Sequence, residues 1–198
     1  MLSLHNKKGS LNTKTIFLIG GFFIWGIYTM KSNKYNYYGV VGGELQIKAS
    51  IKIACNVINP SNAKESELLL SELIAVESDN GNATDYSPDY GEGLTQFDRP
   101  TFESVKAYFL QSRFKDLLQK IKTYCLVDVA NATYEDLRVS PMLSIVMARL
   151  LFYKLPHSIP ADKYDRWLLY KKYFNSELGA TTQDKYYLAS NNAVFKVA

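Results

Sequence analysis

The sequence contains few of the side chains that bind transition metals. Its 198 residues include only two histidines, His5 and His157, and two cysteines, Cys55 and Cys125. Zinc sites use three or four His, Cys or acidic ligands at characteristic spacings, and these four residues do not provide them. The sequence also lacks a glycine-rich loop of the kind that binds nucleotide phosphates. We therefore expect no metal and no cofactor.

Acidic residues are missing from the first part of the chain. Residues 1–39 contain five lysines and no Asp or Glu, although the whole chain has a net charge of +4. The rest of the chain has 18 Lys and Arg against 19 Asp and Glu, which is a net charge of −1. A nucleic-acid-binding domain needs a cationic surface, so we expect no nucleic acid as a partner.

Residues 15–30 contain no charged side chain and are flanked by Lys14 and Lys31. Such a segment is typical of a short transmembrane helix, with Trp25 and Tyr28 suited to the membrane interface. The segment is slightly shorter than a usual span, and the flanking lysine side chains can extend to the interface. A cleaved signal peptide or a buried core helix are the alternatives, but no small-residue cleavage site follows.

This segment divides the chain into four parts. We expect a basic tail at 1–14, a membrane anchor at 15–30, a linker at 31–60 and a folded domain at 61–198. Lysines before the anchor slightly outnumber those after it, so the positive-inside rule places the domain outside the cytoplasm. That location is the periplasm, the cell envelope or the membrane of a viral particle. There, Cys55 and Cys125 could form a disulfide; otherwise they remain two buried thiols.

The folded domain is predicted to be mainly α-helical. Asn62 and Glu65 form a potential capping box before a helix that continues to Glu77. Residues 82–100 predict turns or a small β-hairpin. Ser140 and Pro141 predict the start of a buried helix. Further helices are expected from about 98 to 118, within 119–137, over 142–152 with Ser144 and Arg149 as its polar positions, over 162–173, and from 182 onward.

Glu77 is the carboxylate with the most unusual predicted environment. It lies on the apolar stripe of its helix, in the last turn, together with Leu70, Leu73 and Ile74. Burial and the negative end of the helix dipole both raise the pKa of a carboxyl group there. Such a group can donate a proton near neutral pH, as a glycosidase general acid does. The alternative is a carboxylate that reaches solvent or pairs with an arginine.

The residues after Glu77 carry a family resemblance. Glu77-Ser78 is followed by a turn-rich stretch and by Gly93-Leu94-Thr95-Gln96. This pattern resembles the lytic transglycosylases of the lysozyme-like superfamily, and in particular small muralytic proteins of phages. Three further segments also resemble those proteins: 148–153, Pro156 with Pro160, and 170–175 with Gly179 and Thr181. Together with Glu77-Ser78 and the Gly-Leu-x-Gln pattern, the resemblance covers about residues 61–187.

The resemblance implies an α+β, lysozyme-like fold and an enzyme that cleaves the muramic acid to glucosamine linkage of peptidoglycan. Glu77 would protonate the glycosidic oxygen and then accept a proton from the sugar 6-hydroxyl, closing a 1,6-anhydro ring. The acetamido group of the substrate would assist at the anomeric carbon. The residues expected to bind substrate are Ser78, Gly93 and Gln96, with Tyr86, Tyr90 and Phe97 as stacking groups. Ser78 would otherwise hold Glu77 itself.

Two departures from the family pattern leave alternatives open. The Ala-Tyr-Asn segment of such enzymes is missing, and Tyr173 and Asn175 are the candidates for its place. Glu92 stands where the family has a small or apolar residue, and as a second carboxylate it would allow hydrolysis by inversion. The loop acids Asp79, Asp85, Asp89 and Asp98 compete for that role. A lysozyme-like domain without activity, acting as a tethered adaptor, is the alternative to an enzyme.

Overall fold

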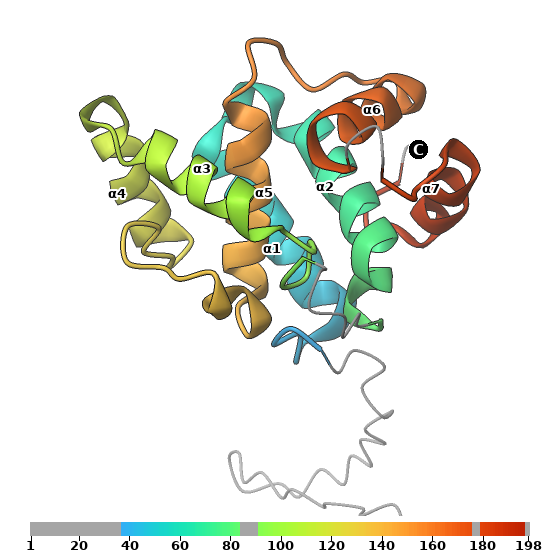
Figure 1. Ribbon diagram of the computed structural model, residues 1–198, viewed down its shortest axis with the longest axis horizontal. Coiled ribbons are helices and arrows are strands. Elements are labelled where there is room, and N and C mark those ends of the chain that lie inside the picture. Colours follow the sequence, from blue (N-terminus) through green and yellow to red (C-terminus); the bar gives the residue numbers. More distant parts are fainter. Residues whose placement is uncertain (1–36, 84–90, 176–178, 197–198) are drawn as a thin grey trace, which may run out of the picture. The chain divides into compact units, whose positions relative to one another are not determined.

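A computed structural model describes residues 37–83, 91–175 and 179–196 of the chain (Figure 1). The predicted tail, the predicted anchor at 15–30, and both Tyr86 and Tyr90 lie outside the described residues. Within the described ranges, no helix combines the length and the apolar character needed to cross a membrane.

The described chain is mainly helical, as predicted. Its longer helices are α1 (Gly43–Ile58), α2 (Ala63–Ser78), α3 (Arg99–Phe109), α4 (Lys115–Tyr124), α5 (Pro141–Tyr153), α6 (Lys163–Tyr170) and α7 (Gln183–Ala189), and a π-helical turn, Lys171–Asn175, continues α6. In the part of the chain that the structure describes, the only strand-like pairing is one antiparallel bridge between Glu92 and Phe97. The region 91–97 is therefore a turn rather than a two-stranded β-hairpin.

Helix α5 lies at the centre of the described body (Figure 1). Its start is as predicted: the Ser140 side chain accepts a hydrogen bond from the backbone N–H of Leu143, and Pro141 is the first helical residue. Residues 143–152 are all buried, so this helix has no solvent-facing side along most of its length. It contacts α1, α2 and α3, and α2 in turn contacts α6 and α7.

The predicted linker at 31–60 is wrong, because residues 43–58 form helix α1 in the core. Its isoleucines at 47, 51 and 58, together with Ala54 and Cys55, repeat at helical spacing and are buried. This apolar face packs against α5 and α2. The glycines and tyrosines that precede the helix carry no helical period, and they obscured the pattern that begins after Gly43.

The helix predicted from about 98 to 118 is divided into two. It begins as expected after Asp98, whose side chain accepts a 2.7 Å hydrogen bond from the N–H of Thr101. Helix α3 ends at Phe109, Gln111 adopts an extended conformation, and α4 starts at Lys115. The break brings the rings of Phe109 and Phe114 to a centroid distance of 4.7 Å. A short aromatic cluster thus replaces the continuous helix.

Helix α2 begins after Asn62 as predicted, but the capping box does not form. The Asn62 side chain accepts a 2.9 Å hydrogen bond from the N–H of Ile159 and donates to the Ile159 carbonyl at 3.2 Å. Its amide also donates to the side chain of Glu65. Asn62 therefore ties the start of α2 to the segment after α5 and provides no side-chain cap for its own helix.

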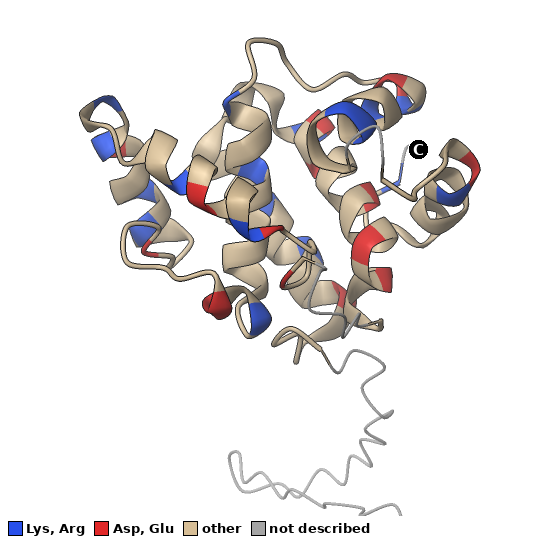
Figure 2. Ribbon diagram, viewed as in Figure 1, with Lys and Arg blue, Asp and Glu red and all other residues tan. Residues whose placement is uncertain are grey.

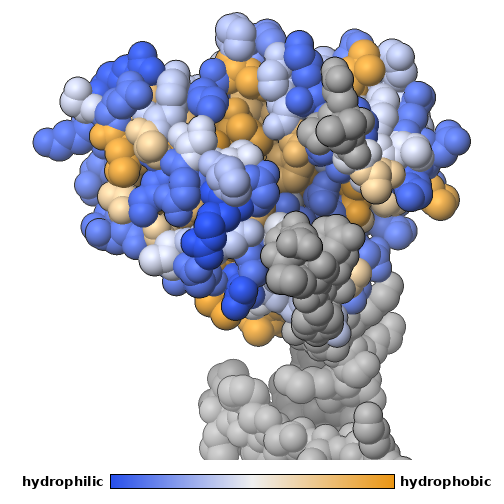
Figure 3. All heavy atoms as spheres, in the orientation of Figure 1, coloured by the Kyte–Doolittle hydropathy of each residue, from blue (hydrophilic) through white to orange (hydrophobic). Residues whose placement is uncertain are grey.

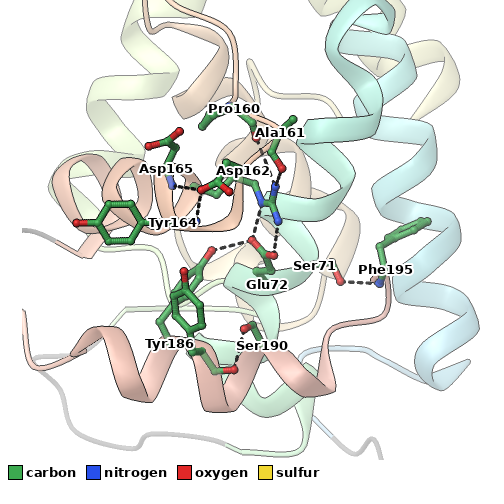
Figure 4. A network of polar contacts seen from close by, with 12 residues as sticks. Ser71, Glu72, Pro160, Ala161, Asp162, Tyr164, Asp165, Tyr186, Ser190 and Phe195 are labelled. Carbon is green, nitrogen blue, oxygen red and sulfur yellow. Dashed lines mark hydrogen bonds and ion pairs between the residues drawn. The ribbon is translucent and has the colours of Figure 1, made fainter. Parts of the chain in front are cut away.

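A buried ion pair connects α2, α6 and α7 (Figure 4). Arg166 donates to both carboxylate oxygens of Glu72, at 2.8 and 2.7 Å, and the Tyr186 hydroxyl donates to the same carboxylate at 2.8 Å. All three side chains are almost completely buried.

Other charged residues of both signs are spread over the helices (Figure 2). The face of the molecule shown in Figure 3 is mostly hydrophilic, with hydrophobic residues in its upper centre.

The two cysteines do not form a disulfide. Cys55 on α1 and Cys125 after α4 are both buried and free. Burial raises the pKa of the Cys55 thiol to about 12 and that of Cys125 to about 11. Both side chains therefore belong to the apolar core as neutral thiols.

Candidate functional site

Glu77 lies in the last turn of α2, on the face that the sequence predicts to be apolar. Leu70, Leu73 and Ile74 on the same face are completely buried, whereas Glu77 is half-buried. Burial raises the pKa of the Glu77 carboxyl to about 7, in the predicted direction and from one of the two predicted causes; the effect of the helix dipole stays a prediction. The carboxyl group is therefore about equally protonated and ionised at neutral pH.

The polar partner of Glu77 is Tyr170, at the end of α6. The Tyr170 hydroxyl donates a 2.5 Å hydrogen bond to Oε1 of Glu77. A hydrogen bond to the ionised form lowers the pKa of Glu77, so Tyr170 partly offsets the effect of burial. Tyr170 itself is completely buried. Its burial is the main cause that raises the pKa of its hydroxyl, and the negative charge of Glu77 is the second. The hydroxyl therefore stays protonated and acts as a hydrogen-bond donor.

Aromatic rings hold Tyr170 in place. Its ring stacks on Phe174 at a centroid distance of 6.0 Å and an angle of 17°. Trp167 and Tyr186 pack on it at 5.9 and 5.1 Å. Phe174 in turn packs edge-on against Phe97. These contacts fix the ring that carries the hydroxyl bound to Glu77, while burial of the Glu77 carboxyl raises its pKa.

A π-helical turn follows Tyr170 and gathers further polar groups. Lys171 donates through Nζ to the Asn175 side chain at 2.8 Å and to the carbonyls of Gly179 and Thr181 at 2.7 and 3.1 Å. The Asn175 amide donates weakly to the Thr181 hydroxyl at 3.4 Å. Turns of this rare type occur frequently at functional sites. The turn brings the predicted residue Asn175 into the same region as Tyr170.

Sequence analysis missed Tyr170, Lys171 and Thr181 as site residues, although all three belong to segments that carry the family resemblance. Tyr170 looks like an ordinary residue on the apolar side of its helix. A buried tyrosine hydroxyl needs a hydrogen-bond partner, so a tyrosine on the apolar side of a helix indicates that a polar group lies nearby. The identity of that partner is not visible in the sequence, because Glu77 lies 93 positions away.

Ser78 was expected to hold either substrate or Glu77, and its contacts fit the second role. It is completely buried, and its hydroxyl lies 2.7 Å from the Leu94 carbonyl and accepts a hydrogen bond from the N–H of Gly81. Asp79, Asn80 and Gly81 all have positive φ, so the chain turns sharply at this point. Ser78 thus fixes the end of α2, and with it Glu77, against the Gly-Leu-x-Gln turn.

Gly93 and Phe97 also serve packing. A Cβ atom on Gly93 would lie 2.4 Å from the Ser144 hydroxyl and 2.6 Å from the Leu137 carbonyl, and the residue has a φ of +76°. The glycine therefore allows the turn to approach α5 closely. Phe97 is buried in the core beside Phe174. Both residues are therefore occupied in packing within the protein, and their expected roles toward a saccharide stay predictions.

Gln96 is half-buried, and its side-chain amide is engaged by the protein. It donates to the Gly93 carbonyl at 2.8 Å and to the Tyr38 hydroxyl at 2.9 Å. Its backbone has a positive φ of 49°. The amide therefore closes the turn 93–96 and joins it to the segment before α1.

Glu92 is held by an arginine, which argues against a role as the second carboxylate. Arg138 donates to its two oxygens at 2.8 and 2.5 Å. Asp79 and Asp98 are also placed in local structure, since Asp79 ends α2 and Asp98 caps α3. Asp85 and Asp89 lie outside the described residues. Among the described residues, Glu77 is therefore the acid of this region that combines burial with an oxygen, Oε2, for which no hydrogen bond to another described residue is found.

Tyr173 is half-buried at the π-helical turn. Its ring lies 6.0 Å from the His157 ring, and the Lys172 ammonium lies 5.1 Å from its centroid. Tyr173 and Asn175 thus belong to the turn that directly follows Tyr170, the partner of Glu77. No cluster of three potential metal ligands occurs among the described residues.

This arrangement can donate and accept one proton at neutral pH. Glu77 has a pKa near 7, a fixed hydrogen-bond donor on one oxygen and partial exposure for contact with a ligand. These are the properties of a general acid and base. Comparison of the chain with models of protein families, with curated proteins and with solved structures finds no match in any of the three.

Proposed function

We propose that the protein cleaves the muramic acid to glucosamine bond of peptidoglycan, with Glu77 as its general acid and base. The observation that supports this most strongly is the half-buried Glu77 carboxyl, raised in pKa and bound by the Tyr170 hydroxyl. A general acid works best when its pKa lies near the pH of reaction, and this carboxyl meets that condition.

The proposed reaction proceeds in two proton transfers. Protonated Glu77 donates its proton to the glycosidic oxygen as the bond from that oxygen to the anomeric carbon breaks. The acetamido oxygen of the substrate bonds transiently to that carbon. Ionised Glu77 then accepts the proton of the 6-hydroxyl, whose oxygen attacks the anomeric carbon and closes the 1,6-anhydro ring. One protein carboxylate is sufficient, which agrees with the engagement of Glu92 by Arg138.

Tyr170 has a positioning role in this proposal. Its hydrogen bond fixes the rotamer of Glu77 and leaves the other carboxyl oxygen, Oε2, for the substrate. Ser78 and the turn 93–96 support the end of α2 from the opposite side through the contact with Leu94. The polar groups of Gln96, Tyr173 and Asn175 remain the proposed contacts for sugar hydroxyl and acetamido groups.

The test is digestion of purified peptidoglycan by the full chain and by Glu77→Gln. We expect the wild type to release fragments and Glu77→Gln to lose at least about 100-fold in rate, because the general acid is absent. Glu67→Gln changes another carboxylate of α2 and should retain activity. Equal activity of wild type and Glu77→Gln would remove Glu77 from the mechanism.

Mass analysis of the fragments distinguishes the two chemistries. Products that end in 1,6-anhydromuramic acid indicate a lytic transglycosylase, whereas reducing ends indicate a lysozyme-type hydrolase that uses a water molecule. We expect anhydro ends. Reducing ends would mean that water instead of the 6-hydroxyl attacks the anomeric carbon, and they would contradict the proposed closure of the 1,6-anhydro ring.

Residues 15–30 are proposed to anchor this activity in a membrane, with the folded domain outside the cytoplasm or in a virion membrane. An anchor would raise the concentration of the enzyme next to the cell wall. The full chain should resist extraction from membranes by alkaline carbonate. Paired substitution of Phe22→Lys and Ile24→Lys should release it, because charged residues at the centre of a span are unfavourable. Extraction of the unchanged chain would contradict the anchor.

The competing proposal is a lysozyme-like adaptor without activity. The observation that favours it is that Ser78, Gly93 and Phe97 are all buried and occupied in packing. An adaptor would bind peptidoglycan or a particle without releasing any fragment. Absence of products from both the wild type and Glu77→Gln, with the chain folded, would decide for it.

A further inference from the structure

Helix α5 contains two polar residues within its buried length, and the structure explains one of them. The Ser144 hydroxyl accepts a 3.2 Å hydrogen bond from the N–H of Leu94 and so docks the turn 93–96 on the helix. Arg149 is 1% exposed and has no comparable use. A cation buried to this extent normally has an acidic partner, because burial of an unpaired charge is unfavourable.

The contacts of Arg149 leave its charge uncompensated. Its neighbours are the Cys55 thiol and the ring of Tyr153, whose centroid lies 5.8 Å from the guanidinium carbon. Nε is buried and finds no hydrogen-bond partner among the residues that the structure describes. None of the ion pairs found within the described ranges includes Arg149. Burial lowers the pKa of the guanidinium, but an arginine stays protonated at neutral pH.

Arg149 lines a cavity of about 190 Å³ at the C-terminal end of α5. Besides Arg149, the cavity is lined by the end of α5 and the segment that follows it, together with two asparagines: Phe152, Tyr153, Leu155, residues 156–159, Asn59 and Asn62. Asn62 holds the segment after α5 in place through its two hydrogen bonds to Ile159. The cavity is therefore a formed pocket with one buried cation, partly aromatic sides and a fixed rim.

The chemistry of the pocket selects a small anion. A guanidinium presents N–H donors in a planar fork that matches the two oxygens of a carboxylate. The volume corresponds to about six water molecules at roughly 30 Å³ each, which suits a carboxylate with a short substituent. Phe152 and Leu155 are apolar residues of a lining whose exposed surface is otherwise mostly polar.

We propose that this pocket is a carboxylate-binding site in which Arg149 pairs with the anion. The carboxylate comes either from a small free acid or from a group on a larger molecule. The pocket is connected to the candidate active site through aromatic rings, since Phe152 stacks on Phe174 at 6.2 Å and Phe174 stacks on Tyr170. If the proposed function holds, the larger source is the lactyl group of a muramic acid without its peptide stem, because an amide bond to the stem removes the carboxylate charge.

The direct test uses the full chain with ¹⁵N-labelled arginine. The Nε–H signal of Arg149, assigned by its loss in Arg149→Lys, is followed during titration with sodium acetate at constant ionic strength. We expect a saturable shift of this signal and none for the exposed Arg113. A wild-type spectrum in which no Nε–H signal shifts saturably would overturn the proposal, whether or not the variant folds.

A thermal measurement provides the second test. Acetate at ten times its dissociation constant should raise the Tm of the wild type by about 3 to 6 °C relative to chloride. Arg149→Met should show no acetate-dependent rise and should retain or exceed the wild-type Tm in chloride, because it removes an unpaired buried charge. Arg113→Met is the matched control and should keep the full acetate effect. An acetate response that persists in Arg149→Met would contradict the site.

The source of the carboxylate is tested with two sugars. N-acetylmuramic acid carries the lactyl carboxylate and N-acetylglucosamine lacks it. A response of the Arg149 signal to acetate and to the first sugar indicates the larger source, and a response to acetate alone indicates a free acid. These measurements do not depend on turnover. Glu77→Gln should therefore show the same acetate shift, so failure of the carboxylate site and failure of the enzymatic proposal are distinguishable.

Discussion

The Tyr170 hydroxyl and the Glu77 carboxyl form a 2.5 Å hydrogen bond between residues 93 positions apart in the chain. The bond joins the last turn of α2 to the last residue of α6. It lies beside the stacked rings of Tyr170 and Phe174, so one oxygen of Glu77 has a fixed donor. This pair is the centre of the proposed active site.

Replacement of Tyr170 by phenylalanine should shift the pH dependence of the proposed activity. The hydroxyl stabilises the ionised form of Glu77, so its loss raises the pKa of Glu77 above about 7. A hydrogen bond to a charged group contributes about 1.5–3 kcal/mol, which corresponds to a rise of about one pKa unit or more. The basic limb of the kcat/KM profile should therefore move to higher pH. Tyr186→Phe is the control, because its hydroxyl contacts Glu72. A basic limb that stays in place would contradict the coupling.

The ionisation of Glu77 should also make the free energy of unfolding depend on pH. The folded-state pKa is about 7 and the ordinary value is 4.5, so the folded state binds more protons between these values. Stability therefore falls as pH rises from about 4.5 to about 7 and is then constant, with a total of about 3 kcal/mol from this group. Glu77→Gln should lack this decrease in urea unfolding measured across the pH range. The exposed Glu103→Gln should retain it. Parallel curves for wild type and Glu77→Gln would show that the carboxyl is solvated.

Breaking the buried ion pair between Glu72 on α2 and Arg166 on α6 should lower the free energy of unfolding strongly. Glu72→Gln leaves a buried cation without its carboxylate and should cost about 3–5 kcal/mol, measured by denaturant unfolding. Replacement of both residues by methionine should recover much of the loss, because no unpaired charge remains. The exposed pair Arg99 and Glu135 provides the comparison, and Glu135→Gln should change stability far less, because solvent screens an exposed ion pair. Similar losses for the two pairs would contradict the buried geometry.

Gly93→Ala distinguishes a packing role from a substrate-binding role. The new Cβ would meet Ser144 and Leu137 at under 3 Å, and the residue has a positive φ. We expect a loss of stability of about 1–2 kcal/mol or more, measured by thermal unfolding. Gly42→Ala is the control, because Gly42 has a negative φ and its nearest neighbour is the Gln46 side chain. Unchanged stability with reduced activity would instead favour contact with a saccharide.

Local patterns in the sequence were sufficient for several elements. Ser140 and Pro141 predicted the start of α5, Asp98 and Thr182 predicted the caps of α3 and α7, and the apolar period of α2 predicted the burial around Glu77. Each of these depends on residues within a few positions of one another. Helix α1 has an equally regular period, and it was missed because the glycines and tyrosines before it favoured a linker.

The candidate site was only partly predictable, because sequence patterns report on residues within a few positions of one another. Glu77 and Asn175 lie in recognisable local patterns, whereas the roles of Ser78, Gly93, Phe97 and Glu92 depend on neighbours from other segments. Ser78 and Leu94 are 16 positions apart, and Glu92 and Arg138 are 46 positions apart. Residue type and spacing indicate that a polar group needs a partner, but they do not identify it.

The sequence by itself determined that the domain is helical, where several helices begin, and that a carboxylate stands on an apolar stripe at a helix end. Tertiary structure decided that Tyr170 binds this carboxylate, that Arg138 engages Glu92, and that Arg149 is buried without an acidic partner. Helix caps and amphipathic periods are set by interactions over three or four residues. The pKa of a buried group depends instead on all atoms packed around it, and these come from distant parts of the chain.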